Sequence, residues 1–132
     1  MEAASPVDVV RTHYEAIRRH DRAALMATLT EDVDWQAVGP TTMPLGGSYR
    51  GHAEAQRFFS TVSRACEVLE FTVDRMVPDG DTVIVFGHEH FRVRATGRSW
   101  STDWIQLHTV GGGAICRFRE YTDTAAIVAA FA

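Results

Sequence analysis

Residues 82–110, TVIVFGHEHFRVRATGRSWSTDWIQLHTV, decide the fold of this chain. Apolar and polar residues alternate along Thr82–Ala95 and again along Ser99–Val110, which is the two-residue period of a β-strand. Only Thr96-Gly97-Arg98 separates the two runs, and a glycine-bearing link this short joins antiparallel neighbours. The stretch therefore predicts a long β-hairpin.

The alternation continues on both sides of this hairpin. Val68–Val77 and Ala114–Tyr121 show the same period and connect to it through Pro78-Asp79-Gly80-Asp81 and Gly111-Gly112-Gly113. Because these links are also short and contain glycine, the four runs predict an antiparallel meander. A further alternating run, Val33–Val38, predicts a separate strand nearer the N-terminus.

Helical patterns flank the strands. Ser5-Pro6-Val7-Asp8 combines a hydroxyl N-cap, a proline and an early carboxylate, so we expect a first helix that runs to about His20. Asp21 is expected to cap a shorter second helix, and Asp123 a last helix over Thr124–Phe131. The third helix carries an apolar stripe made of Ala55, Phe58, Phe59 and Val62.

Three helices followed by a meander predict an α+β fold with the helices on one face of the sheet. Long strands joined by tight turns must twist, so the sheet should curve around the helices and leave a cavity. Gly39–Gly51 contains four glycines and two prolines, and we expect an irregular loop there, near the cavity mouth. At 132 residues, the chain is expected to form one domain, residues 1–132.

The composition excludes several functions. The net charge is −4 and the thirteen basic residues are scattered arginines, so no nucleic-acid partner is expected. The chain has no lysine, which excludes imine chemistry with a carbonyl substrate. No run is long enough to span a membrane, and Met1–Pro6 lacks the start of a secretory signal. With only Cys66 and Cys116, we expect reduced thiols, a cytoplasmic location and no membrane partner.

Several short motifs occur in order along nearly the whole chain: Val9–Ala16 (VVRTHYEA) with Asp21, Leu29–Trp35 (LTEDVDW), Tyr49–Gly51 (YRG), Asp79–Asp81 (DGD) and Phe118–Thr124 (FREYTDT). Together they resemble the SnoaL-like branch of the NTF2-like, or ketosteroid-isomerase-like, superfamily. The resemblance implies a cone-shaped, curved antiparallel sheet wrapped around three helices, and a homodimer formed through the outer sheet face. Its members include isomerases, polyketide cyclases, epoxide hydrolases, dehydratases and binding modules, so the fold alone does not choose a function.

Ketosteroid isomerases of this superfamily use a tyrosine on the first helix, an aspartate base at the end of the first strand and a protonated aspartate on a later strand. When the chain is matched to them at Val9-Val10, these positions fall on His13, Ala37 and Gln106, with Tyr14 beside the first. Because alanine stands in place of the base, the resemblance does not imply this isomerase mechanism.

Limonene-epoxide hydrolases, which the chain also resembles, use an Arg-x-Asp pair on the second long strand and an aspartate before the tyrosine of the last strand. The matching positions are His88, His90 and Glu120. Only the last of them, Glu120, has a carboxylate where the hydrolases have one. Residues two apart on a strand share a face, and imidazoles titrate near neutral pH. We therefore expect Glu120, with His88 or His90, to act as catalytic acid and base.

The direction of the two histidines is left open by the alternation. The odd-numbered residues of Thr82–Ala95 are the more apolar set, which favours outward histidines and an inward Glu89. The similarity in loop length to the relatives favours inward histidines, and this is the register we predict, although a bulge would allow both. His88, His90 and Glu120 also have the donor types of an open zinc site, but His-x-His pairs are common and no metal is expected.

Further aromatic and polar residues are expected to contact a ligand, because small-molecule pockets are mainly apolar with a few polar groups. They are Tyr14, Trp35, Trp104, Gln106, His108 and Phe118. The helical stripe also admits His13 in place of Tyr14, and the aromatic residues could instead belong to the core. Trp35 and Trp104 are favoured because a buried indole N–H needs a partner that a cavity can provide.

Two functions follow from these observations. The first is a cofactor-free enzyme of the isomerase, cyclase, hydrolase or dehydratase type, which acts by acid–base chemistry on an apolar, polyketide- or terpenoid-like molecule. The second is a non-catalytic ligand-binding or dimerisation module whose polar groups only orient a guest.

Overall fold

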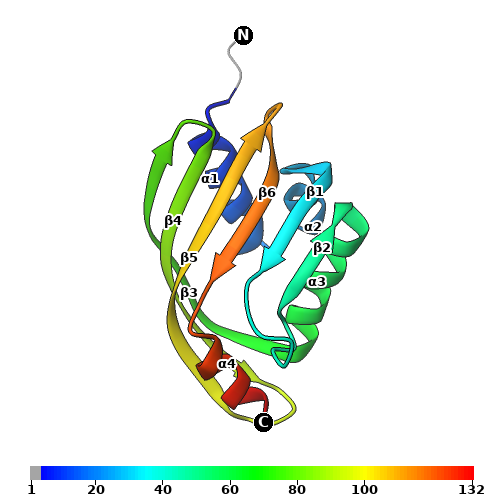
Figure 1. Cartoon of the computed structure of the whole chain (residues 1–132), viewed down its shortest axis with the longest axis vertical. Helices are drawn as coiled ribbons and strands as arrows, with labels where there is room; N and C mark the ends of the chain where they lie inside the picture. The colour runs from blue at the N-terminus through cyan, green and yellow to red at the C-terminus, as the bar shows by residue number, and fades with distance from the viewer. Residues whose placement is uncertain (1–3) are drawn as a thin grey trace.

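The computed structural model describes residues 4–132, so the part of the N-terminal expectation that rests on Met1–Ala3 lies outside the described residues. Six strands form one curved, unclosed sheet in the order β2-β1-β6-β5-β4-β3 (Figure 1). The strands are β1 (Leu29–Ala37), β2 (Gly47–Arg50), β3 (Cys66–Asp79), β4 (Thr82–Val93), β5 (Ser99–Gly111) and β6 (Ala114–Tyr121). The helices are α1 (Pro6–Arg18), α2 (Arg22–Ala27), α3 (Gly51–Ala65) and α4 (Thr124–Phe131).

The predicted meander is confirmed, because β3, β4, β5 and β6 pair consecutively and antiparallel. β1 lies next to β6 and runs parallel to it, a long-range pairing that local periodicity does not reveal. The prediction of an irregular loop over Gly39–Gly51 is wrong at its end, where β2 pairs antiparallel with β1. Gly47 adopts a φ of 116°, which glycine allows, and the chain turns back there along β1.

The predicted helix starts are confirmed. Ser5 and Asp8 form a capping box, in which Ser5 Oγ accepts from the Asp8 N–H at 3.2 Å and the Asp8 carboxylate accepts from the Ser5 N–H at 3.4 Å. Asp21 and Asp123 cap α2 and α4. α1 ends before His20, whose φ of 56° does not fit a right-handed helix. Over residues 4–132, no helix combines the length and the apolar character needed to cross a bilayer.

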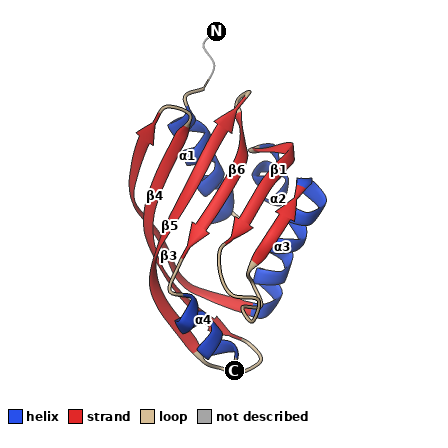
Figure 2. Cartoon of the chain, viewed as in Figure 1, coloured by secondary structure: helices blue, strands red, loops and turns tan. Residues whose placement is uncertain are grey.

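The curvature of the sheet creates an inner and an outer face. Figure 2 shows α1 and α2 behind the sheet, α3 alongside β2, and α4 at the end where the C-terminus lies. The β3–β4 register shifts twice, between Val68 and Glu70 and between Val73 and Arg75. Extra residues of this kind bend a strand, so β3 curves around the helices.

Aromatic stacks fix the inner face. Trp35 of β1 stacks on Phe118 of β6, with ring centroids 3.6 Å apart. Phe71 of β3 stacks on Trp104 of β5 at 5.0 Å, across the intervening strand β4. Gly87 is the β4 residue paired with Trp104, so its missing side chain leaves room for the indole to lie over the strand.

We expect Gly87→Ala to destabilise the fold by about 1–3 kcal/mol, as overpacking of a core does. The added methyl group would overlap the Trp104 ring and the Thr72 carbonyl oxygen, and a backbone oxygen cannot rotate away. Urea unfolding followed by tryptophan fluorescence measures the loss. Gly111→Ala is the matched control, because its methyl group would meet Cys116 Sγ at an ordinary 3.5 Å. Equal stability of Gly87→Ala and the wild-type protein would contradict this packing.

Candidate functional site

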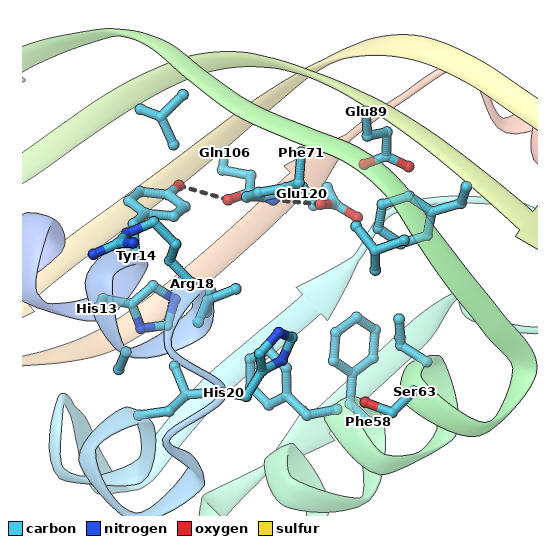
Figure 3. A pocket seen from close by; sticks show the side chains of 18 of the residues that line it. His13, Tyr14, Arg18, His20, Phe58, Ser63, Phe71, Glu89, Gln106 and Glu120 are labelled. Atoms are coloured by element: carbon cyan, nitrogen blue, oxygen red, sulfur yellow. Dashed lines mark hydrogen bonds between the residues drawn. The ribbon is translucent and has the colours of Figure 1, made fainter.

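A cavity of about 910 Å³ lies between the inner face of the sheet and the helices (Figure 3). Its rim includes residues of α1 and α2, and Met43, Leu45 and Ile127 line the end near α4. The walls are mainly apolar and include the aromatic residues Trp35, Phe58, Phe59, Phe71 and Phe118. This size and lining are typical of a small-molecule site.

A row of hydrogen bonds crosses the cavity wall. Tyr14 on α1 donates its hydroxyl proton to Gln106 Oε1 at 2.5 Å. Gln106 Nε2 donates in turn to Glu120 Oε2, as Figure 3 shows. Gln106 and Glu120 are paired neighbours in the β5–β6 register, so the sheet itself brings them together. The row therefore holds one oxygen of Glu120 in place while the carboxyl group lies in the cavity wall.

Two buried histidines lie beside this row. His108 Nε2 is 2.8 Å from the Tyr14 hydroxyl oxygen, and because Tyr14 gives its proton to Gln106, His108 donates to Tyr14. His13 Nδ1 is 2.9 Å from Thr28 Oγ1, which gives its own proton to a backbone carbonyl, so His13 also donates. Burial lowers the pKa of His13 to about 3 and that of His108 well below its ordinary value. Both imidazoles are therefore neutral near pH 7.

Glu89 of β4 is a second carboxyl group in the cavity wall, and it is only 5% exposed. Its Oε2 accepts a hydrogen bond from Trp100 Nε1 at 2.6 Å. Burial, and after it repulsion by Glu120, raise the pKa of Glu89 to about 8. Burial also raises the pKa of Glu120, against the opposite effect of the hydrogen bond from Gln106. At neutral pH the pair therefore retains at least one proton.

The expectation that His88 and His90 face the cavity is wrong. The β4–β5 register is continuous along the whole strand pair, so the odd-numbered residues stay inward and Glu89 lies inside. Burial of the apolar set stabilises this register, and a shift by one residue would expose all of that set. The histidines lie on the outer face, away from Glu120, so the three do not form a zinc site. Within residues 4–132, no cluster of three or more His, Cys, Asp or Glu side chains is arranged to hold a metal ion.

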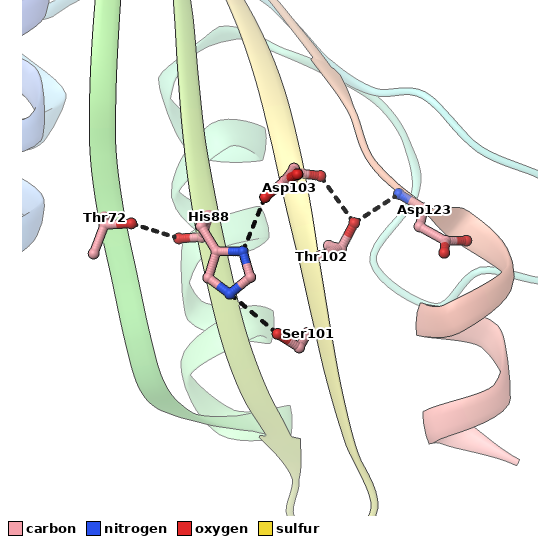
Figure 4. A network of polar contacts seen from close by, with 6 residues as sticks. All are labelled: Thr72, His88, Ser101, Thr102, Asp103 and Asp123. Atoms are coloured by element: carbon pink, nitrogen blue, oxygen red, sulfur yellow. Dashed lines mark hydrogen bonds and ion pairs between the residues drawn. The ribbon is translucent and has the colours of Figure 1, made fainter.

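His88 belongs instead to a polar network on the outer sheet face (Figure 4). Its Nδ1 lies 3.0 Å from Asp103 Oδ1, and its Nε2 lies 3.1 Å from Ser101 Oγ. This is the order of contacts in a Ser–His–Asp triad, but the Asp103 side chain is 93% exposed. Bulk water competes for contacts at such a position, so we interpret the network as surface polar contacts between neighbouring strands.

The other residues predicted from the sequence lie in or directly behind the cavity wall. Trp104 stacks on Tyr14, and His108 bonds to the same residue, so both support the wall from behind. Between His13 and Tyr14, it is the tyrosine that joins the row of hydrogen bonds. The predicted residues that line the cavity itself are Tyr14, Trp35, Gln106, Phe118 and Glu120.

The sequence favours Trp35 and Trp104 as ligand contacts because a buried indole N–H needs a partner. Trp35 and Trp104 bury their Nε1 atoms with no hydrogen-bond partner among residues 4–132. The indole that has a partner is that of Trp100, for which the sequence predicts no role, and it donates to Glu89, which faces inward only in the alternative register. The apolar odd-numbered positions of β4 were the signal for Glu89, whereas no local pattern indicates that Trp100 reaches across from β5.

The chain is similar to known proteins in both sequence and structure. The sequence model of the SnoaL-like domain family matches residues 10–118. The comparison with curated proteins finds no match.

Similar solved structures cover nearly the whole chain. An NTF2-like protein from Burkholderia thailandensis is 31% identical, with a TM-score of 0.89 over 100% of this chain and 99% of that one. An NTF2-like protein from Burkholderia xenovorans is also 31% identical, with a TM-score of 0.85 over 98% of each chain. TerC, co-crystallised with polyporic acid, is 22% identical, with a TM-score of 0.82 over 96% of this chain and 98% of that one.

Glu89→Gln should flatten the dependence of stability on pH. A carboxyl group whose pKa rises on folding stabilises the fold below its unfolded pKa, and this contribution is lost as the pH rises through the folded value, here about 8. We expect the Tm of the wild-type protein to fall by roughly 5 °C or more between about pH 6 and pH 9, and the variant to lose most of this fall. Differential scanning calorimetry at constant ionic strength measures both curves.

The matched control for this measurement is Glu31→Gln, which changes an exposed glutamate of β1. Its curve should follow that of the wild-type protein. Parallel curves for the wild-type protein and Glu89→Gln would show that Glu89 is ionised in the folded state at neutral pH, and would contradict the site described.

Proposed function

This chain belongs to the SnoaL-like family, and from that premise we propose that it is an enzyme that transfers protons on a largely apolar small molecule held in the cavity. Glu120 is the base and Glu89 is the acid. The observation that carries the proposal is that two carboxyl groups line one aromatic-walled cavity and have different hydrogen-bond partners. Pairs of acids with different surroundings are how enzymes obtain an acid and a base from one residue type.

The surroundings of each carboxyl group support its role. Glu120 accepts a hydrogen bond from Gln106, which Tyr14 holds in turn, so its orientation is fixed. This hydrogen bond favours the ionised form and opposes the effect of burial, which raises the pKa of Glu120. Glu89 is almost fully buried, and its burial favours the protonated form at neutral pH. An oriented carboxylate and a neutral carboxylic acid are the two groups that enolisation of a carbonyl compound requires.

The proton transfer balances within the pair. Glu120 removes a proton from the carbon next to a substrate carbonyl, and the electrons of that C–H bond form a C=C bond. The carbonyl oxygen receives the proton of Glu89, which gives a neutral enol, a protonated Glu120 and an ionised Glu89. Return of a proton to carbon restores the pair, and return to a different carbon isomerises the substrate. The buried neutral histidines take no part in this transfer, since burial keeps both from gaining a proton.

The aromatic lining of the cavity supports the proposal that the substrate is apolar and contains rings. Aromatic side chains from β1, β3, β6 and α3 line the space, and flat guests pack well against such surfaces.

The test uses hydrogen exchange, which needs no knowledge of the natural substrate. In D₂O, the protein should accelerate exchange of the α-hydrogens of the bicyclic ketone 2-tetralone, followed by ¹H NMR. Glu120→Gln should lower the accelerated rate at least about 100-fold, because it removes the base. Glu89→Gln should lower it by about tenfold or more, because the enol oxygen loses its proton donor.

The control for this test is again Glu31→Gln. Glu31 does not line the cavity, so this variant should accelerate the exchange of 2-tetralone as much as the wild-type protein does. Binding of 2-tetralone by each variant is measured separately, by tryptophan fluorescence. Wild-type exchange rates in Glu120→Gln would overturn the assignment of the base. Binding without any exchange above the buffer rate would overturn the enzymatic function and favour a binding module.

A further inference from the structure

Two buried acidic groups line the cavity, and among residues 4–132 no cation is bonded to either of them. These groups are Glu89 and Glu120, and within the same residues the side chain of each accepts a hydrogen bond only from a neutral donor, the indole of Trp100 or the amide of Gln106. A buried carboxylate is normally paired with a cation or with several donors, because an uncompensated buried charge is costly. Over residues 4–132, no salt bridge involves either of these carboxyl groups.

Four residues with basic side chains outside the buried interior also border the cavity: Arg11, Arg18 and His20, which are exposed, and Arg22, which is half-buried. Arg18 is mostly exposed and is bound to Glu15 on the same helix. Arg22 donates to Ser60 Oγ at 3.1 Å, on the side of α3. Charges in contact with water are screened, so these arginines do not neutralise the carboxyl pair inside.

The histidines of the interior do not supply the missing charge either. His13 and His108 are almost fully buried and donate to neutral oxygens, those of Thr28 and Tyr14. Their rings pack edge to face, with centroids 5.3 Å apart, so a proton on either would also repel the other. The proton that the pair retains is the only compensation that residues 4–132 provide, and a cationic ligand would supply the positive charge that these side chains do not.

The walls are suited to receive such a charge. The rings of Trp35, Phe58, Phe59, Phe71 and Phe118 surround the space. The face of an aromatic ring attracts a cation, and the attraction grows when water is excluded. An apolar skeleton on the same molecule would bury against these rings as well.

We infer that the ligand of this cavity is an organic amine, whose ammonium group is attracted by the negative charge of the Glu89–Glu120 pair and whose apolar skeleton packs on the aromatic walls. The inference rests on the proposed function only for the location of the site and for the substrate being a small molecule. It adds the charge of the substrate, and it predicts that anionic analogues are excluded, because a carboxylate guest would be repelled by the same pair.

The experiment compares three probes on one bicyclic skeleton: 2-aminotetralin, 2-tetralol and tetralin-2-carboxylate. They carry a positive charge, no charge and a negative charge at neutral pH. Isothermal titration calorimetry should show that the amine binds at least about tenfold more tightly than the alcohol, and the alcohol more tightly than the carboxylate. In Glu89→Gln/Glu120→Gln, the preference for the amine should disappear while the alcohol still binds.

The single variants Glu89→Gln and Glu120→Gln repeat the comparison in case the double variant does not fold, and each should reduce the preference. Glu31→Gln should retain it in full. The inference is overturned if the carboxylate binds as tightly as the amine to the wild-type protein, or if the variants keep the wild-type preference. If the protein accelerates exchange of 2-tetralone but does not prefer the amine, the proposed function stands and this inference is wrong. If it prefers the amine but does not accelerate exchange, this inference stands and the proposed function is wrong.

Discussion

Two buried carboxyl groups line one cavity, and no side chain of residues 4–132 forms a salt bridge with either; the proposed chemistry of this protein depends on that constraint. Glu89 comes from β4 and Glu120 from β6, on either side of β5. The two cannot both be ionised at neutral pH without an electrostatic cost, so one proton stays in the pair. A proton held in this way can be given to a ligand or displaced by a positive charge.

The rest of the fold fixes the positions of these groups. The register between β5 and β6 places Gln106 beside Glu120, and Tyr14 fixes the amide from the opposite layer. Trp104 can lie flat over β4 only because Gly87 has no side chain. The position of each polar group is therefore set by backbone pairing and by aromatic packing, which supports a site that is preorganised before a ligand binds.

Much of the fold could be predicted because its signals are local. Alternation and glycine-bearing links located the four strands of the meander, and Ser5, Asp21 and Asp123 marked helix starts that the structure confirms. The parallel pairing of β1 with β6 joins segments far apart in the sequence, and no periodic pattern within either strand predicts it. The part of the candidate site on β4 could not be predicted from alternation alone. A two-residue period shows which residues share a face, but it does not show which face is buried. The choice between His88 and Glu89 therefore needed the apolar content of each face, which favoured Glu89.

The most direct test of the account is the protonation state of the two glutamates, measured by ¹³C NMR of the side-chain carboxyl carbons in protein labelled at glutamate. Glu89→Gln and Glu120→Gln assign the two resonances. The account predicts that at least one of them keeps the chemical shift of a protonated carboxyl group at neutral pH and titrates near pH 8. If both resonances instead show fully ionised carboxylates at neutral pH, the pair retains no proton, and the acid–base roles assigned to it are wrong.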